Sequence, residues 1–204
     1  ILEDLSLKID KNKKIGFIGQ SGSGKSTLVN LFCGLLKPVN GYLKIDDKDF
    51  EKSKILFQEN IGYVPQSVTI FDESIIFNIT LEPDPSKIDI EKLKKVLKEV
   101  KLDETINNLP NKELEIVGEN GAKLSGGQCQ RLGIARVLYR NPSIIVFDEA
   151  TSALDDETEK HVLDSLFRNY ENKTIIISTH RAKPLSYCDL VYEIKDKKLE
   201  KIEK

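Results

Sequence analysis

The residues of this chain that are best suited to chemistry begin with a glycine-rich turn at residues 19–26. Its glycines, Gly19, Gly22 and Gly24, let the backbone curve tightly, so that successive N–H groups face one bound anion. Lys25 and Ser26 at its end suit phosphate oxygens and Mg²⁺, respectively. A short apolar run precedes the turn, and apolar residues at helical spacing follow it. This order of strand, turn and helix favours a phosphate-binding loop over a chance glycine-rich turn.

Two acidic residues, Asp148 and Glu149, end another apolar run. The carboxyl ends of parallel strands meet at one edge of a sheet, where ligands bind. We therefore expect Asp148 near Mg²⁺ at the phosphate-binding loop, and Glu149 where it aligns or deprotonates a water that attacks the γ-phosphate. Taken alone, paired acidic residues at a strand end more often cap a helix or lie in a solvated turn. Only the presence of the glycine-rich loop at residues 19–26 makes a role in phosphate chemistry the better expectation.

Residues 124–128, Leu-Ser-Gly-Gly-Gln, identify the family. With its other motifs, the sequence resembles the nucleotide-binding domain of an ATP-binding-cassette (ABC) transporter along nearly the whole chain. The further motifs, in family order, are the glycine-rich loop, Gln66 after Val64 and Pro65, the strand that ends in Asp148 and Glu149, residues 152–155, and His180 after a strand. Ser125 and two glycines at a helix start would form a second anion-binding end.

The resemblance implies that the domain binds ATP and Mg²⁺ and hydrolyses the ATP. The implied catalytic residues are Glu149, His180 and Gln66. The implied Mg²⁺ ligands are Ser26, Gln66 and Asp148. The implied nucleotide contacts are Gly19, Gln20, Ser21, Gly22, Ser23, Gly24, Lys25, Ser26, Thr27, Ser125, Gly126, Gly127, Gln128 and Asp155.

The resemblance also implies partners. Residues 125–127 of one subunit would cap the ATP held by the glycine-rich loop of another, which gives a head-to-tail pair. Because Glu149, His180 and residues 124–128 are all intact, we expect a homodimer that hydrolyses ATP at both sites, although an intact half can also pair with a degenerate partner. Residues 71–75 and 117–121 resemble segments of export-type cassettes that contact the transmembrane domain, and residues 1–7 resemble a strand that follows a linker from that domain.

We therefore expect the ATPase domain of an exporter at the cytoplasmic face of the inner membrane, with its permease domain fused upstream. The bacterial lipid and lipid-linked oligosaccharide flippases are the favoured subgroup. An importer subunit remains an alternative, although it would usually lack the Glu119-centred segment. A soluble cassette ATPase is the other, although the chain has no room for a long coiled coil between Ser26 and Leu124.

The elements that must position these residues alternate between apolar strands and amphipathic helices, which indicates an α/β fold. The expected class is a P-loop NTPase (RecA-like) core with an inserted α-helical subdomain, the ABC ATPase fold. The core would comprise residues 1–66 and 143–204, with a partial N-terminal β-subdomain, and the helical signature subdomain residues 67–142. Strands are expected at residues 14–18, 42–45, 61–64, 143–147 and 174–178, and helices after residue 26 and around residues 90–100, 127–140 and 163–170.

Composition excludes several classes of partner and of structure. The 204 residues carry 31 basic and 33 acidic side chains, without a long basic run, so we expect no nucleic-acid partner. No apolar run reaches the 18 or so residues of a membrane span. Cys33, Cys129 and Cys188 lack a metal-ligand spacing and are expected to be reduced thiols. Because position 1 is not Met, we expect the natural start, and the aromatic residue on which this family stacks adenine, to lie upstream.

Overall fold

The computed structural model describes residues 2–202, which group into two compact units. The sheet unit comprises the described residues of Ile1–Tyr63, Pro142–Glu149 and Asn172–Lys204. The helical unit comprises Val64–Asn141 and Ala150–Glu171. The two-domain division expected from the sequence stays a prediction, and these units differ from it by grouping residues 64–66 and 150–171 with the helices and residue 142 with the sheet.

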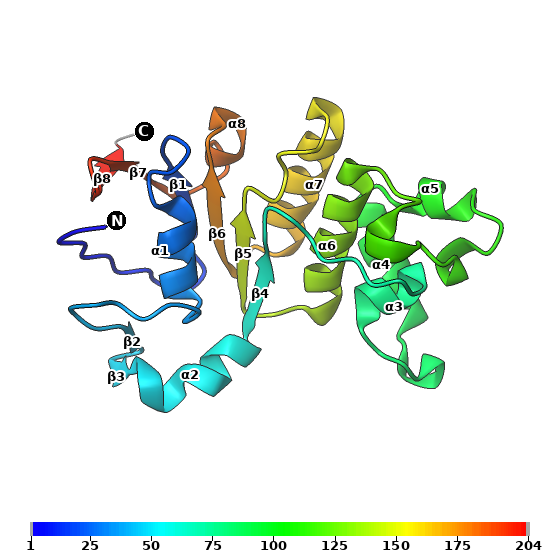
Figure 1. Cartoon of the computed structure of the whole chain (residues 1–204), viewed down its shortest axis with the longest axis horizontal. Coiled ribbons are helices and arrows are strands. Elements are labelled where there is room, and N and C mark those ends of the chain that lie inside the picture. Colours follow the sequence, from blue (N-terminus) through cyan, green and yellow to red (C-terminus); the bar gives the residue numbers. More distant parts are fainter. Residues whose placement is uncertain (1, 203–204) are drawn as a thin grey trace. The chain divides into compact units, whose positions relative to one another are not determined.

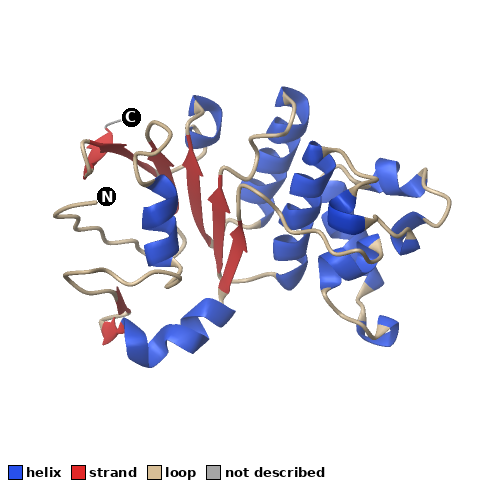
Figure 2. Cartoon of the chain, in the orientation of Figure 1, coloured by secondary structure: helices blue, strands red, loops and turns tan. Residues whose placement is uncertain are grey.

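One mixed sheet forms the centre of the sheet unit (Figures 1 and 2). Within residues 2–202 it has six strands, in the order β4-β5-β6-β1-β7-β8. Their bounds are β1 Lys14–Ile18, β4 Ile61–Val64, β5 Ile144–Asp148, β6 Thr174–Thr179, β7 Leu190–Lys195 and β8 Lys198–Ile202. β6 pairs in parallel with both β5 and β1, β1 pairs in parallel with β7, and β8 is antiparallel to β7. The carboxyl ends of β5, β6 and β1 therefore meet at one edge.

Continuous β-branched and apolar runs explain the central strands. Every residue of β6 is buried, as is typical of a parallel strand that is covered on both faces. Helix α1 (Lys25–Phe32) contacts β5 and β6 through buried residues such as Val29, which packs in one cluster with Phe17, Val146 and Ile176. This packing fixes the start of α1 at the end of β1. The unit also contains β2 (Lys44–Ile45), β3 (Lys48–Asp49), α2 (Phe50–Glu59) and α8 (Ala182–Leu185).

The helical unit is built around α6 (Gly126–Arg140), which contacts α3 (Ile75–Thr80) and α4 (Ile90–Glu99). α4 also contacts α7 (Asp156–Asn169) and is amphipathic, as the sequence predicts, with Leu93, Val96 and Leu97 buried. The buried Glu99 accepts hydrogen bonds of 2.8 Å from Asn169 Nδ2 and Tyr170 Oη, so its charge does not remain unsatisfied. The remaining short elements are η1 (Pro85–Lys87), α5 (Asp103–Asn107), η2 (Lys112–Leu114) and η3 (Glu119–Gly121).

Two expected strands differ in the structure. The run over residues 42–45 forms a strand only at Lys44–Ile45, and Tyr42 is largely exposed. Residues 2–7 form no strand, while residue 1 lies outside the described part. Leu2, Leu5 and Leu7 instead pack, partly buried, against the core, and Glu3 N donates to Lys197 O at 3.0 Å. Among residues 2–202, no helix combines the length and apolar character that crossing a membrane requires.

Candidate active site

The glycine-rich loop follows β1 directly and leads into α1. Gly24 has a φ of 108°, in the left-handed region that residues with a side chain rarely adopt. At Gly19, an added Cβ would lie 2.8 Å from Ile194 O, so a side chain there would collide with the backbone of β7. Both glycines are thus required by the local geometry, as the sequence interpretation of the turn assumes.

Lys25 is buried and points back into this loop. Its Nζ donates to Gly19 O at 2.8 Å and to Gln20 O at 3.0 Å, and lies 3.6 Å from Glu149 Oε1. Two backbone carbonyls and one carboxylate therefore hold the ammonium group in place. Such fixed polar partners permit a charged group to be buried.

Glu149 lies between two potential cations. Its Oε2 is 3.5 Å from His180 Nδ1, and its Oε1 faces Lys25. The backbone N–H of Glu149 donates to Ser178 O at 2.9 Å, which continues the pairing of β5 with β6 past the end of β5. Glu149 has a φ of 50°, an uncommon left-handed conformation for this residue type, and His180 remains mostly exposed. The structure thus brings Lys25, Glu149 and His180 together at the carboxyl ends of the strands.

Asp148 is almost completely buried at the end of β5. Tyr63 Oη donates to its Oδ2 at 3.3 Å, and Ser178 Oγ donates to its Oδ1. Burial, and secondarily the charge of Asp148, raise the pKa of Tyr63 above its usual value. Sequence reasoning missed both hydroxyl residues, because neither belongs to a motif. Their only signal in the sequence is a hydroxyl side chain near the end of each of two apolar strands.

Oxygen atoms around this edge suit a hard cation and phosphate. Ser26 is exposed in the first turn of α1, and together with the Asp148 carboxylate it offers the oxygen ligands that Mg²⁺ prefers. Ser23 Oγ is buried without a hydrogen-bond partner among the described atoms. A hydroxyl without a partner in a loop of this shape fits a ligand that accepts hydrogen bonds.

The signature motif starts α6 with a reciprocal cap. Gln128 N donates to Ser125 Oγ at 3.2 Å, and Ser125 N donates to Gln128 Oε1 at 2.7 Å. This capping box leaves Gly126 exposed at the helix start. Ser125 and Gln128 therefore have a structural role in addition to the predicted contact with nucleotide.

The loop before α7 is tied to α6 by a second residue that sequence reasoning missed, Gln130. Its Nε2 donates to Ser152 Oγ at 3.1 Å, and its Oε1 accepts from Ala153 N at 2.9 Å. Asp155 caps α7 by accepting from Thr158 N at 2.9 Å, and the hydrogen bonds of Thr158 lower the pKa of Asp155. Gln66 has an exposed side chain, and its backbone carbonyl accepts from Gln130 Nε2 at 3.5 Å.

The predicted site residues thus fall into two groups, one in each compact unit. The sheet unit contains the first group, Gly19, Gln20, Ser21, Gly22, Ser23, Gly24, Lys25, Ser26, Thr27, Asp148, Glu149 and His180. The helical unit contains the second, Gln66, Ser125, Gly126, Gly127, Gln128 and Asp155.

The two segments that resemble export-type cassettes lie side by side in the helical unit. Ser74 and Ile116 form an antiparallel bridge, and Val117 N donates to Glu73 O at 3.2 Å. Ile116 is 53% exposed and Phe71 is 43% exposed. Large apolar side chains are therefore presented to solvent where these segments meet.

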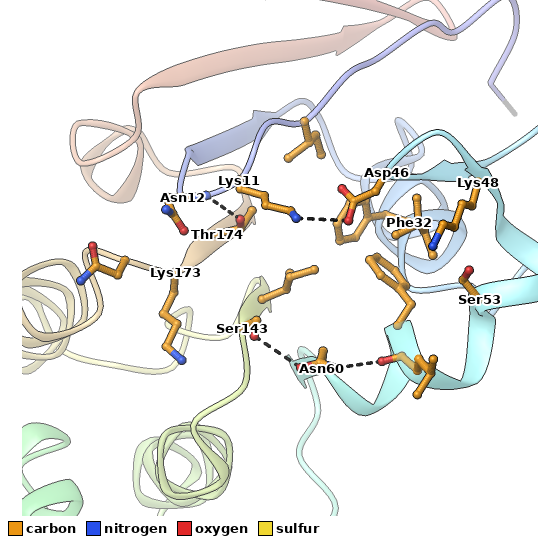
Figure 3. A pocket seen from close by; sticks show the side chains of 16 residues that line it. Lys11, Asn12, Phe32, Asp46, Lys48, Ser53, Asn60, Ser143, Lys173 and Thr174 are labelled. Atoms are coloured by element: carbon orange, nitrogen blue, oxygen red, sulfur yellow. Dashed lines mark hydrogen bonds and ion pairs between the residues drawn. The ribbon is translucent and has the colours of Figure 1, made fainter.

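A cavity of about 580 Å³ lies at the opposite edge of the sheet from the glycine-rich loop (Figure 3). It is lined by Asn12 before β1, Ser143 before β5 and Lys173 before β6, so it adjoins the amino ends of the strands. The ion pair of Lys11 with Asp46, 3.2 Å apart, crosses its rim. The groups that could perform phosphate chemistry are therefore not those that line this cavity.

The fold and the residues at the carboxyl ends of the strands define a P-loop NTPase. Helix α6, which begins at the signature motif with a capping box, is a further feature of this class of protein. The family profile described as "ABC transporter" matches residues 2–152, and the chain belongs to this family.

Known proteins place the chain with exporters. It is 40% identical over 200 residues to the ABC transporter ATM1 of Toxoplasma gondii, a match that covers 98% of this chain and 18% of that protein. It is 35% identical over 192 residues to the ATP-dependent lipid A-core flippase of Ralstonia nicotianae, covering 93% of this chain and 32% of that protein. A solved bacterial Atm1-family ABC exporter with ATP bound matches with a TM-score of 0.89 and 32% identity, covering 98% of this chain and 35% of its own.

These matches confirm the predicted family and the ABC ATPase fold, and they favour the exporter class over the importer and soluble alternatives. The chain spans 18% to 35% of the length of these three relatives. It therefore corresponds to one part of each of these longer proteins.

Proposed function

We propose that this domain binds ATP with Mg²⁺ and hydrolyses it to power export by a larger transporter. The observation that carries the proposal is the placement of Glu149 between Lys25 and His180, at 3.6 and 3.5 Å, at the edge where the phosphate-binding loop begins. The likeness to an exporter with ATP bound supports the choice of nucleotide.

In the proposed reaction, N–H groups of the loop and Lys25 bind the phosphates. Lys25 exchanges its contacts with Gly19 O, Gln20 O and Glu149 Oε1 for phosphate oxygens, and the Glu149 carboxylate then accepts a proton from the attacking water. His180 is exposed and close enough to Glu149 to orient that carboxylate and to contact the γ-phosphate.

We propose Ser26, Asp148 and Gln66 as the groups that hold Mg²⁺. The ion, when bound, neutralises charge on the β- and γ-phosphates. Ser26 and Asp148 belong to the sheet unit, and their oxygen atoms suit this hard cation. Gln66 belongs to the helical unit, and its role rests on the order of the motifs.

The test separates binding from chemistry. Glu149→Gln keeps the size of the side chain but removes the base, so we expect wild-type ATP affinity and turnover that is lower by about 10²-fold or more. Lys25→Ala removes the charge that contacts phosphate, so ATP affinity itself should fall. Calorimetric titration with MgATP and a phosphate-release assay measure the two effects. A Glu149→Gln protein that hydrolyses ATP at nearly the wild-type rate would exclude Glu149 as the base.

The proposed partner at the nucleotide is a second copy of this domain, arranged head to tail. Ser26 at the start of α1 and Ser125 at the start of α6 are both exposed, and each marks a helix end suited to phosphate. In the pair, residues 125–127 of one copy would face ATP bound by Lys25 of the other. Asp155 would support this contact from the loop that Gln130 anchors.

The proposed coupling partner is a transmembrane domain, in the same polypeptide upstream of this chain. The surface formed by Phe71, Ile116 and the segment around Glu119 would contact its intracellular extensions. Such exposed apolar patches with polar borders are typical of protein interfaces. With this partner, the proposed location of the domain is the cytoplasmic face of the inner membrane.

A further inference from the structure

Asp148 is hydrogen-bonded from both neighbouring strands. β5 lies between β4 and β6 in the sheet, and Asp148 is in register with Ser178 of β6. Tyr63 of β4 donates to Oδ2 at 3.3 Å, and Ser178 donates to Oδ1. Each carboxylate oxygen therefore accepts one hydroxyl hydrogen, which fixes the plane of the carboxylate and leaves further lone pairs for a ligand.

Burial of Asp148 and Ser178 restricts the orientation of the Asp148 carboxylate. Asp148 is 3% exposed and Ser178 is 0% exposed, so few water molecules can replace a missing donor.

We propose that Tyr63 and Ser178 are positioning residues that orient the Asp148 carboxylate toward the divalent cation bound with ATP. This inference rests on the proposed function. Residues that hold a metal ligand in place typically contribute 10–100-fold to metal affinity, because the ligand no longer has to be ordered when the metal binds. Neither hydroxyl touches the nucleotide in this proposal, and both act through Asp148 alone.

The experiment uses Tyr63→Phe and Ser178→Ala in the 204-residue chain. Both remove one hydroxyl and little else. Binding of a fluorescent ATP analogue is titrated in excess EDTA, and then at fixed nucleotide with increasing Mg²⁺. Mn²⁺ binding, followed by electron paramagnetic resonance, measures the cation directly. We expect nucleotide affinity in EDTA to be unchanged within about two-fold and the cation concentration at half-saturation to rise by about ten-fold.

The matched control is Tyr192→Phe, because Tyr192 lies on β7 of the same sheet and packs against Phe17, with ring centroids 6.0 Å apart. It should leave the cation titration unchanged. In the Asp148→Asn background, adding Tyr63→Phe should cause no further rise, because the hydroxyl acts only through Asp148.

Three outcomes would overturn the inference: wild-type cation titrations in Tyr63→Phe, an equal shift in Tyr192→Phe, or independent effects of Tyr63→Phe and Asp148→Asn. If Ser178→Ala does not fold, Tyr63→Phe decides alone, because Tyr63 is only partly buried. A wild-type chain that binds ATP equally well with and without Mg²⁺ would instead contradict the proposed function.

Discussion

The pKa of the core residue Cys33 is affected by burial and by Asp148 of the candidate active site. Cys33 is the C-cap residue of α1, where its backbone N–H donates to carbonyls of the last turn, and the residue is 3% exposed. Burial, and secondarily the charge of Asp148, raise its pKa from 9.0 to about 12. Between these two values the folded chain keeps a proton that the unfolded chain releases, so the folded state loses stability as the pH rises above 9.

The corresponding prediction is that the free energy of unfolding falls between pH 9 and about 12, with a slope of at most about 1.4 kcal/mol per pH unit from this thiol. Urea unfolding from pH 8 to 10.5, followed by circular dichroism, measures it. Cys33→Ala should lower stability at every pH but flatten the slope. The half-buried Cys129 provides the control, and Cys129→Ala should keep most of the slope. Identical slopes for the wild type and Cys33→Ala would contradict the assignment.

At the scale of elements, the helix cap of the signature motif can be separated from its predicted contact with ATP. Ser125→Ala removes the oxygen that accepts from Gln128 N, and loss of such a cap costs about 1 kcal/mol. For a chain of this length, the melting temperature should fall by about 2–4 °C.

Ser125→Asp is the matched variant, because Asp also caps helices well but adds a negative charge. We expect wild-type melting for Ser125→Asp together with loss of ATP-dependent pairing, since the added charge repels phosphate. Differential scanning calorimetry and size-exclusion chromatography with MgATP measure the two effects. A melting temperature for Ser125→Ala equal to that of the wild type would show that the cap contributes nothing.

The sequence predicts those elements whose information is local. The mostly apolar runs at residues 14–18 and 61–64 are strands with the predicted bounds, because short, mostly apolar runs suit a buried strand. Leu5, Leu7 and Ile9 alternate as in a half-buried strand, yet they form none. A strand also requires a neighbour that offers a ladder of hydrogen bonds, and no periodicity within the segment supplies that information.

Because sequence patterns carry only local information, they predict some residues of the candidate site and not others. Lys25, Glu149 and His180 belong to motifs that are contiguous in the sequence, so their types and order are visible. The contacts of Tyr63 and Ser178 with Asp148 depend instead on the order of β4, β5 and β6 and on their register. Residues this far apart in the chain become neighbours only through tertiary pairing.

At the scale of the whole molecule, the proposed head-to-tail pair predicts a hydrolysis rate that depends on concentration. If each site needs residues 125–127 of a second copy, the rate per chain should rise with protein concentration until the pair is saturated. Phosphate release is measured over a hundred-fold dilution series at saturating MgATP. The Lys25→Ala variant provides the background rate. A constant rate per chain under dilution would contradict the pair.

The strand that precedes the glycine-rich loop is among the first parts of this chain to be synthesised and among the last to be paired. β1 is Lys14–Ile18, and its described ladders are to β6 and β7, which begin at Thr174 and Leu190. At about 5–20 residues per second, roughly 8–30 s of translation separates β1 from its first partner strand. During that interval a nascent chain carries an apolar strand that lacks both of its neighbours. During synthesis the amino-terminal region therefore exposes an unpaired apolar strand, a feature that favours aggregation, until nearly the whole sheet unit has emerged.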